Sequence, residues 1–269
     1  MHSNIKLTEK YERNGWPSVQ RPDVKPPEGW SLSLITSVNR VRNHQLAPDG
    51  QRIAYQRNAQ KPIWPLRIWI SLTAGGPPVP LLPPTHEGYQ GAPSWSPDGQ
   101  WIAYTEWKER DWMLVKVRVG SGEEPVVLRT DGVPNATPHW SPRNDWITWE
   151  TEQGFVLVSP DGGQQRVLSD DQWLVHTWSR DGSEIFGIRE TENLRLSLVA
   201  LNARTEKARV LADLGPSPPV NNPVKGFSLG ADDRTIATSI VRLRGDLWLL
   251  DGLQWRDRPR RWFSPFRSP

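Results

Sequence analysis

The stretch Trp95–Tyr104, which reads W-S-P-D-G-Q-W-I-A-Y, recurs along this chain of 269 residues. Copies of it, some of them degenerate, occupy residues 46–55, 140–149, 178–187 and 229–238, so five repeats begin 38 to 51 residues apart. A period near 45 residues that is built from short strands is typical of β-propeller blades. We therefore predict an all-β protein, a β-propeller of four-stranded blades with five repeats visible and five or six blades in total.

Each copy of the motif predicts a tight turn between two strands. Pro97 presets the backbone φ, Asp98 can accept a hydrogen bond from the backbone that follows it, and Gly99 takes a positive φ at little cost. Residues before Trp95 are expected to form the innermost strand of a blade. Asn144 stands where other copies have glycine, and the turn should survive there because asparagine tolerates the left-handed region.

The same spacing predicts two further strands in each blade and a division of the chain. A third strand is expected at residues 67–70, 112–115, 155–158, 196–199 and 246–250, and an outer strand at 79–82, 126–128, 166–168 and 209–211. The chain then divides into an N-terminal arm at 1–39, which could add strands to a closing blade, a propeller at 40–263 and a tail at 264–269.

The motif, followed by an Ile-Trp strand and a Gly-Gly turn, resembles the TolB-like or WD40-like (PD40) β-propeller repeat. The resemblance covers about residues 40–263 and implies a TolB-like propeller. Related propellers occur in prolyl-oligopeptidase-type serine peptidases and in sensor modules of signalling proteins. The entry at 34–50 is similar to the peptidase propellers, whereas 244–250 is similar to the sensor type, so the subfamily stays open.

Composition excludes several classes of protein and site. The chain has no cysteine, which excludes disulfides and Cys-ligated zinc, and its formal net charge is only +3. No stretch approaches 18 apolar residues, so we expect no membrane span, and the N-terminus has no apolar signal region, so we expect a cytoplasmic protein. The arginine-rich, aromatic segment at 255–267 is explained more simply by a solvated last strand than by contact with nucleic acid.

Three histidines, His44, His139 and His176, are the weak candidates for catalysis. All three fall on expected innermost strands, which line the central channel. Strand alternation sends His44 and His176 to one face of their blades and His139 to the other. Because no carboxylate occupies an equivalent inner-strand position, polar lining of a wet channel is the simpler interpretation. We predict no metal site and no cofactor.

A G-x-S-x-G match at 226–230 would make Ser228 the nucleophile of an α/β-hydrolase. That chemistry needs a helix directly after the serine and a histidine later in the chain, and the last histidine is His176. We therefore reject Ser228 as a nucleophile.

The 16 tryptophans fall into two groups. Eight occupy equivalent positions of the repeat, Trp95 among them, and are expected to pack between blades. Others lie beside charged residues, and aromatic and carboxylate groups on loops at one mouth of the channel would suit an amine or a peptide terminus. The predicted ligand-binding residues are Trp107, Trp112, Trp149, Glu150 and Trp173.

These features favour a non-enzymatic propeller scaffold that binds a partner protein, a peptide or a small ligand at one mouth of the channel. The alternative is an enzyme or enzyme subunit that uses polar channel residues. It would be hydrolase-like, lyase-like or the regulatory propeller of a serine-peptidase-type complex. A third interpretation is a sensor module of a longer signalling chain. An enzyme requires titratable groups that converge in one pocket, whereas a binding module requires only an accessible aromatic mouth.

Overall fold

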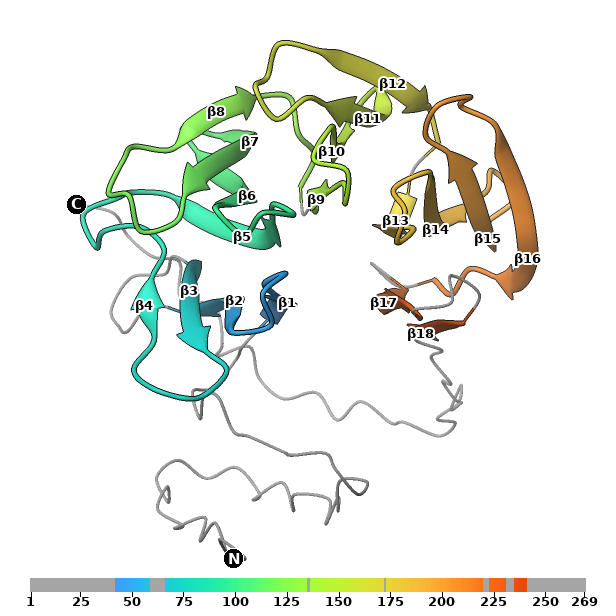
Figure 1. The fold of residues 1–269 in the computed structure, drawn as a ribbon. Coiled ribbons are helices and arrows are strands. Elements are labelled where there is room, and N and C mark those ends of the chain that lie inside the picture. Colours follow the sequence, from blue (N-terminus) through green and yellow to red (C-terminus); the bar gives the residue numbers. More distant parts are fainter. Residues whose placement is uncertain are drawn as a thin grey trace, which may run out of the picture.

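The structure, a computed structural model, describes residues 42–58, 66–134, 136–171, 173–219, 223–230 and 235–240. Within them, 18 strands form four antiparallel four-stranded sheets and one two-stranded sheet, which stand around a central axis (Figure 1). The prediction of an all-β propeller is confirmed. The predicted arm at 1–39, the strand at 246–250 and the arginine-rich tail lie outside the described residues. In the described part of the chain, no helix is long and apolar enough to cross a membrane.

The blades follow one another along the chain, and the first strand of each blade is the innermost (Figure 1). Blade 1 comprises β1 (Arg42–Leu46), β2 (Arg52–Asn58), β3 (Leu66–Leu72) and β4 (Val79–Pro80). Blade 2 comprises β5 (Tyr89–Trp95), β6 (Trp101–Lys108), β7 (Asp111–Arg118) and β8 (Val126–Arg129). Blade 3 comprises β9 (His139–Trp140), β10 (Ile147–Thr151), β11 (Gly154–Val158) and β12 (Gln165–Ser169). Blade 4 comprises β13 (Trp173–Trp178), β14 (Glu184–Glu190), β15 (Arg195–Asn202) and β16 (Ala208–Pro216). The described part of blade 5 comprises β17 (Val224–Leu229) and β18 (Ile236–Ile240).

The motif turn has the chemistry that its sequence predicts. In blade 2, the N–H of Gly99 donates to the carbonyl of Ser96 at 2.9 Å, and the carboxylate of Asp98 accepts the N–H of Gln100 at 2.9 Å. Gly99 has a φ of 67°, and Asn144 takes its place in blade 3 with a φ of 60°. The turn therefore joins the first and second strands of blade 3 even without glycine.

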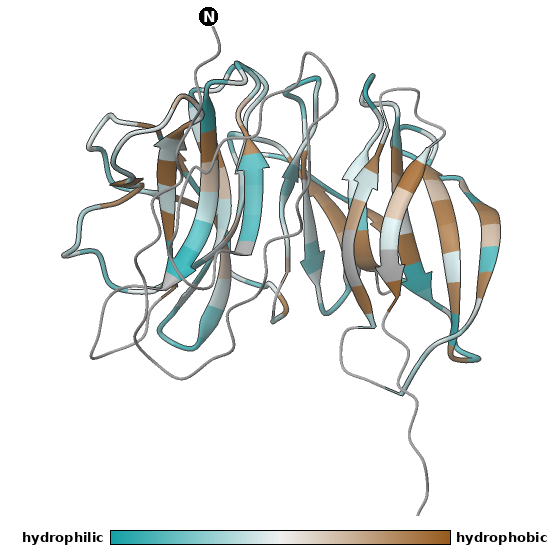
Figure 2. Ribbon diagram, turned by 90° about the horizontal axis from the view of Figure 1, so that it is seen from below, coloured by the Kyte–Doolittle hydropathy of each residue, from teal (hydrophilic) through white to brown (hydrophobic). Residues whose placement is uncertain are grey.

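The core lies between blades rather than inside any one of them. Alternation along β6 directs Ile102 toward blade 1, where it packs with Ile68, and directs Ala103 toward blade 3, where it packs with Trp140. Figure 2 shows apolar residues along the strands and polar residues in many of the connections. Each blade therefore buries its apolar side chains only in contact with its neighbours, as in other repeat proteins.

Motif tryptophans join consecutive blades. The indole N–H of Trp95 donates to the carbonyl of Gln45 at 3.2 Å, and that of Trp178 donates to the carbonyl of His139 at 3.0 Å. In both cases the acceptor is on the innermost strand of the preceding blade. Trp140 differs, because its indole donates to the side chain of Asn144 in its own turn, at 2.8 Å.

Candidate functional site

One position of the second strand carries a polar side chain that contacts the next blade. It is the third residue after the motif isoleucine, namely Gln56, Thr105 and Glu150 in blades 1 to 3. Nε2 of Gln56 donates to the carbonyl of Gln90 at 2.8 Å, and the hydroxyl of Thr105 donates to the carbonyl of Ala136. Glu150 is therefore the ionisable version of a contact that is neutral in the two preceding blades.

Glu150 meets two histidines at the junction of blades 3 and 4. Its Oε1 lies 3.4 Å from Nδ1 of His176, whose side chain is fully buried. Nε2 of His176 lies 2.7 Å from the hydroxyl oxygen of Thr148, and the centroids of the His139 and His176 rings are 4.5 Å apart. The edge of this cluster is closed by Phe155, whose ring centroid is 4.6 Å from that of His176.

The meeting of His139 and His176 corrects the sequence interpretation. Alternation does send the two rings to opposite faces of their own blades, but those faces point at each other across the junction. His44 does not join them, since it lies exposed on β1. Among the residues that the structure describes, no group of three or more histidine, aspartate or glutamate side chains is arranged to hold a metal ion.

Burial shifts the protonation of all three groups toward their neutral forms. It raises the pKa of Glu150 to about 8 and lowers the pKa of His176 to about 3. The pKa of His139 is held well below its usual value, first by burial and then by the neighbouring His176. Glu150 and His176 are adjacent, so they titrate as a pair. Between about pH 3 and about pH 8 the pair holds one proton, which either side chain can carry.

The order Thr148, His176, Glu150 is that of a nucleophile, a base and an orienting acid. However, Thr148 is fully buried, and its hydroxyl oxygen already accepts the N–H of His139 at 3.0 Å. A substrate carbonyl cannot approach a hydroxyl in this position, so the geometry supports a contact between blades. Ser228 lies in the antiparallel ladder of β17, opposite Ala237 of β18.

All four of the predicted ligand-binding tryptophans lie within strands rather than on loops, and two of them are buried. Trp149 lies within β10 and is fully buried, facing blade 2 so closely that a Cβ added to Gly132 would come within 2.2 Å of its ring. Trp173 is buried in β13 and stacks on Phe155 with ring centroids 5.0 Å apart. The expectation of loop positions was wrong for all four tryptophans, and Trp149 and Trp173 are buried because the inter-blade space accommodates their rings.

Trp107 and Trp112 do come together, with Tyr89 as a third member that sequence reasoning missed. The three residues are direct neighbours across β5, β6 and β7, and we call them the aromatic row. Ring centroids are 5.7 Å apart for Tyr89 and Trp112 and 6.4 Å apart for Trp107 and Trp112. Trp107 remains 44% exposed. Only the register of β5 against β6 could have pointed to Tyr89.

The β6–β7 turn beside the aromatic row is a tight two-residue turn. Glu109 and Arg110 both have positive φ, 56° and 80°, as a type I′ hairpin turn requires. The turn lets Trp107 and Trp112 face each other directly across the two strands. Since Tyr89 begins the innermost strand of blade 2, the row starts beside the channel and runs outward along one end of the blade.

Comparisons with known proteins agree with this architecture. No family model matches the chain. It is 35% identical over 117 residues, 42% of its length, to an uncharacterized peptidase, YuxL, of Bacillus subtilis, of which the match spans only 17%. Among solved structures, TolB from Acinetobacter baumannii superposes with a TM-score of 0.57 at 18% identity, covering 76% of this chain and 56% of that one. An oligogalacturonate lyase in complex with manganese gives a TM-score of 0.57 at 13% identity, covering 75% and 59%. The fold is therefore a β-propeller similar to those of TolB and of the oligogalacturonate lyase.

Proposed function

We propose that this protein is a non-enzymatic propeller scaffold that binds a partner protein, a peptide or a small ligand at one mouth of its central channel. The observation that carries the proposal is the aromatic row, in which Trp107 is 44% exposed and rests against Trp112. Exposed aromatic rings that are held in place by neighbours are favourable contact points, because they bury much apolar area at a small cost in conformational entropy.

The burial of the titratable cluster supports binding over catalysis. His176 and Thr148 are fully buried at the junction of blades 3 and 4, and His139 and Glu150 face them there. A catalytic site needs such groups at the wall of a pocket that a substrate can enter. The enzyme alternative would require a different set of residues.

A selection from a phage-displayed peptide library on the immobilised protein tests this proposal. Selected peptides are then measured by fluorescence anisotropy against the wild type, Trp107→Ala and Leu194→Ala. Leu194 is the matched control, because it is a 65% exposed apolar residue in the β14–β15 connection, at the same end of a different blade. We expect Trp107→Ala to weaken binding by about tenfold or more and Leu194→Ala to leave it unchanged. If the selection yields no binders, or if both variants bind equally well, the proposed site is wrong.

A further inference from the structure

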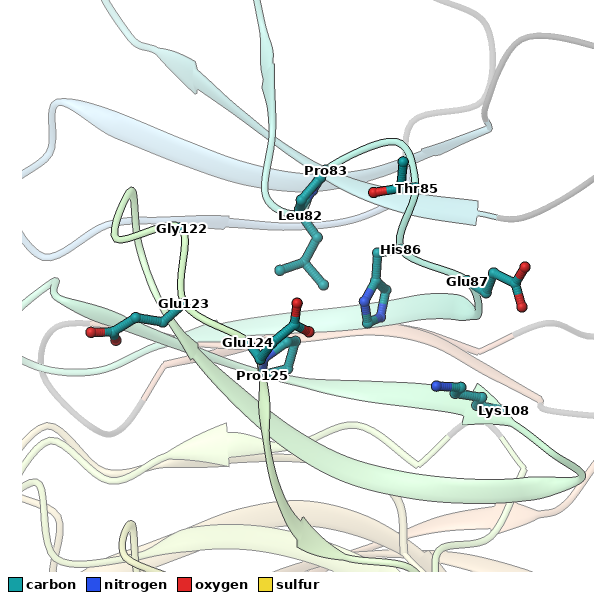
Figure 3. A pocket seen from close by; sticks show the side chains of 10 residues that line it. All are labelled: Leu82, Pro83, Thr85, His86, Glu87, Lys108, Gly122, Glu123, Glu124 and Pro125. Carbon is teal, nitrogen blue, oxygen red and sulfur yellow. The ribbon is translucent and has the colours of Figure 1, made fainter.

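A pocket of about 290 Å³ lies on the opposite face of blade 2 from the aromatic row. Its walls come from the blade 1–blade 2 connection at residues 82–87, from Lys108 at the end of β6, and from the β7–β8 connection at 122–125 (Figure 3). Alternation along β6 explains the separation, since Glu106 and Lys108 point to one side of the sheet and Trp107 to the other. The pocket and the aromatic row are therefore independent sites.

A buried carboxylate fixes the histidine in the wall of this pocket. Oε1 of Glu106 lies 2.7 Å from Nε2 of His86, and its Oε2 accepts the hydroxyl of Tyr104 at 3.1 Å. The side chain of Glu106 is only 4% exposed. Burial and the adjacent Glu106 raise the pKa of Tyr104 well above its usual value, so the phenol stays protonated and donates. A carboxylate offers only lone pairs, so Nε2 of His86 carries the hydrogen of this contact, and Nδ1 is the ring atom left to meet a ligand, as an acceptor when the ring carries one proton.

The backbone is adapted to this arrangement at Gly88. Its φ is +118°, and a Cβ at this position would lie 2.6 Å from Oε1 of Glu106. A residue with a side chain would therefore displace the carboxylate that orients His86. The pairing of a buried carboxylate with a partly exposed histidine is the arrangement that fixes the tautomer and the orientation of a functional imidazole.

Charged groups of both signs reach the space beside His86 (Figure 3). The carboxylate of Glu124 and the ammonium of Lys108 extend toward it from two sides, and Leu82 supplies an apolar wall. Glu87 and Glu123 point outward in the same view. A ligand that satisfies the inner groups needs a cationic donor for Glu124 and for Nδ1 of His86, an oxygen acceptor for Lys108, and an apolar group next to Leu82.

We propose that this pocket binds an α-ammonium group together with the adjacent carbonyl, the chemistry shared by the amino terminus of a peptide and a free amino acid with an apolar side chain. The ammonium group donates to Glu124 and His86, and the carbonyl oxygen accepts from Lys108. A diamine lacks the acceptor and would meet the charge of Lys108. The volume is near the lower limit of small-molecule pockets, ~300 Å³, and suits one or two residues.

Saturation-transfer difference NMR and isothermal titration calorimetry test the proposal with leucyl-glycinamide, its N-acetylated form, free leucine and 1,4-diaminobutane. We expect leucyl-glycinamide to bind and both the acetylated form and the diamine to fail. A stronger signal for free leucine would assign the pocket to amino acids, and a stronger signal for leucyl-glycinamide would assign it to peptide termini. The proposal would be overturned if the acetylated form bound as well as leucyl-glycinamide does. It would also be overturned if neither leucyl-glycinamide nor free leucine bound.

Matched variants locate the binding. Glu124→Gln should weaken binding of the leucine compound by about tenfold or more, because a charge-assisted hydrogen bond is replaced by a weaker neutral one. Glu152→Gln, an exposed carboxylate in the β10–β11 turn, should leave it unchanged, as should Trp107→Ala in the aromatic row. If Glu124→Gln and Glu152→Gln bind alike while both melt as the wild type does, the ligand binds elsewhere.

Discussion

At the junction of blades 1 and 2, the second strand reaches the next blade with an amide, Gln56, whereas at the junction of blades 3 and 4 it uses a carboxyl group, Glu150. The positions are equivalent in the repeat, and both side chains end on the innermost strand of the following blade. The amide of Gln56 makes its contact with the carbonyl of Gln90 without any ionisable group. The contact of Glu150 with His176 keeps one proton between the two side chains, so one propeller contains a neutral and a titratable contact at equivalent positions of the repeat.

The largest effect should be common to both junctions. Trp95→Ala and Trp178→Ala each remove a buried ring and an inter-blade hydrogen bond, and we expect each to lower the free energy of unfolding by about 3–5 kcal/mol. Chemical denaturation measures the loss. Trp107→Ala, at an exposed ring, should cost no more than about 1 kcal/mol. Unchanged denaturation midpoints for the two motif variants would show that these rings do not hold the blades together.

Placing a carboxyl group in the neutral junction should have the next largest effect. Gln56→Glu buries an ionisable group opposite the carbonyl of Gln90 with no histidine to share its proton. We expect the free energy of unfolding to fall by about 3 kcal/mol at pH 7 and by less toward pH 5. The reason is that the carboxyl group must take up a proton when it is buried, which costs more free energy at higher pH. Gln51→Glu, at an exposed position of the motif turn, is the control. A loss that does not vary with pH would argue against the burial of this position.

The pH dependence of the wild type should arise at the other junction. The native pair of Glu150 and His176 keeps one proton from about pH 3 to about pH 8. In the unfolded chain the corresponding proton is on His176 and is lost around pH 6.5. Between pH 6.5 and pH 8 only the folded state holds a proton, so the free energy of unfolding should fall by about 2 kcal/mol as the pH rises. Below pH 6.5, His139 binds a proton only when unfolded, so stability falls there as well. The optimum contributed by this junction is therefore near pH 6.5.

Substitution of Glu150 separates the two limbs of that profile. Glu150→Gln removes the titrating acid, so we expect the decline between pH 6.5 and pH 8 to disappear. The acid limb should steepen, because His176 then joins His139 in binding a proton below pH 6.5 only when unfolded. Thermal denaturation across this pH range measures both limbs. Glu152→Gln, on the adjacent turn, should keep the full profile. A decline that persists in Glu150→Gln would assign the alkaline limb to other residues.

The smallest effect should come from the motif turn of blade 3. Asn144→Gly relieves a side chain from the left-handed region but removes the acceptor of the Trp140 indole. Both contributions to the free energy of unfolding are about 1 kcal/mol and have opposite signs. The net change in that free energy, measured by chemical denaturation, should therefore stay below about 1 kcal/mol. Gly99→Asn in blade 2 is the mirror experiment, in which the left-handed strain is added. A large loss in Asn144→Gly would mean that the indole contact outweighs the relief of strain.

Local spacing was sufficient to predict most of the fold. The repeat that begins at Trp95 gave the blade period, Pro97 to Gly99 predicted the turn, and the third strands of four blades fell where the motif placed them. These features depend on residues that are close in the chain, and their turn chemistry and strand periodicity are therefore readable without any knowledge of distant partners.

The candidate sites were only partly predictable. Alternation within a strand says to which face of its own blade a side chain points, but it does not say what the neighbouring blade presents there. For that reason His139 and His176 were assigned to opposite faces without any sign that these faces meet, and Trp149 was expected on a loop although it lies under Gly132. Tyr89 was missed because its partners depend on the register between strands.

The sequence by itself determined the class of fold, the blade period, the motif turns and the sets of residues that can pack between blades, since each follows from short-range geometry. Tertiary structure alone decided which of those residues meet. It joined Glu150 to His176 across a junction, aligned Tyr89 with Trp107, and placed Glu106 behind His86. The physical reason is that burial and pairing arise from surfaces of neighbouring blades, which are separated by about one repeat in the chain and come together only when the ring of blades forms.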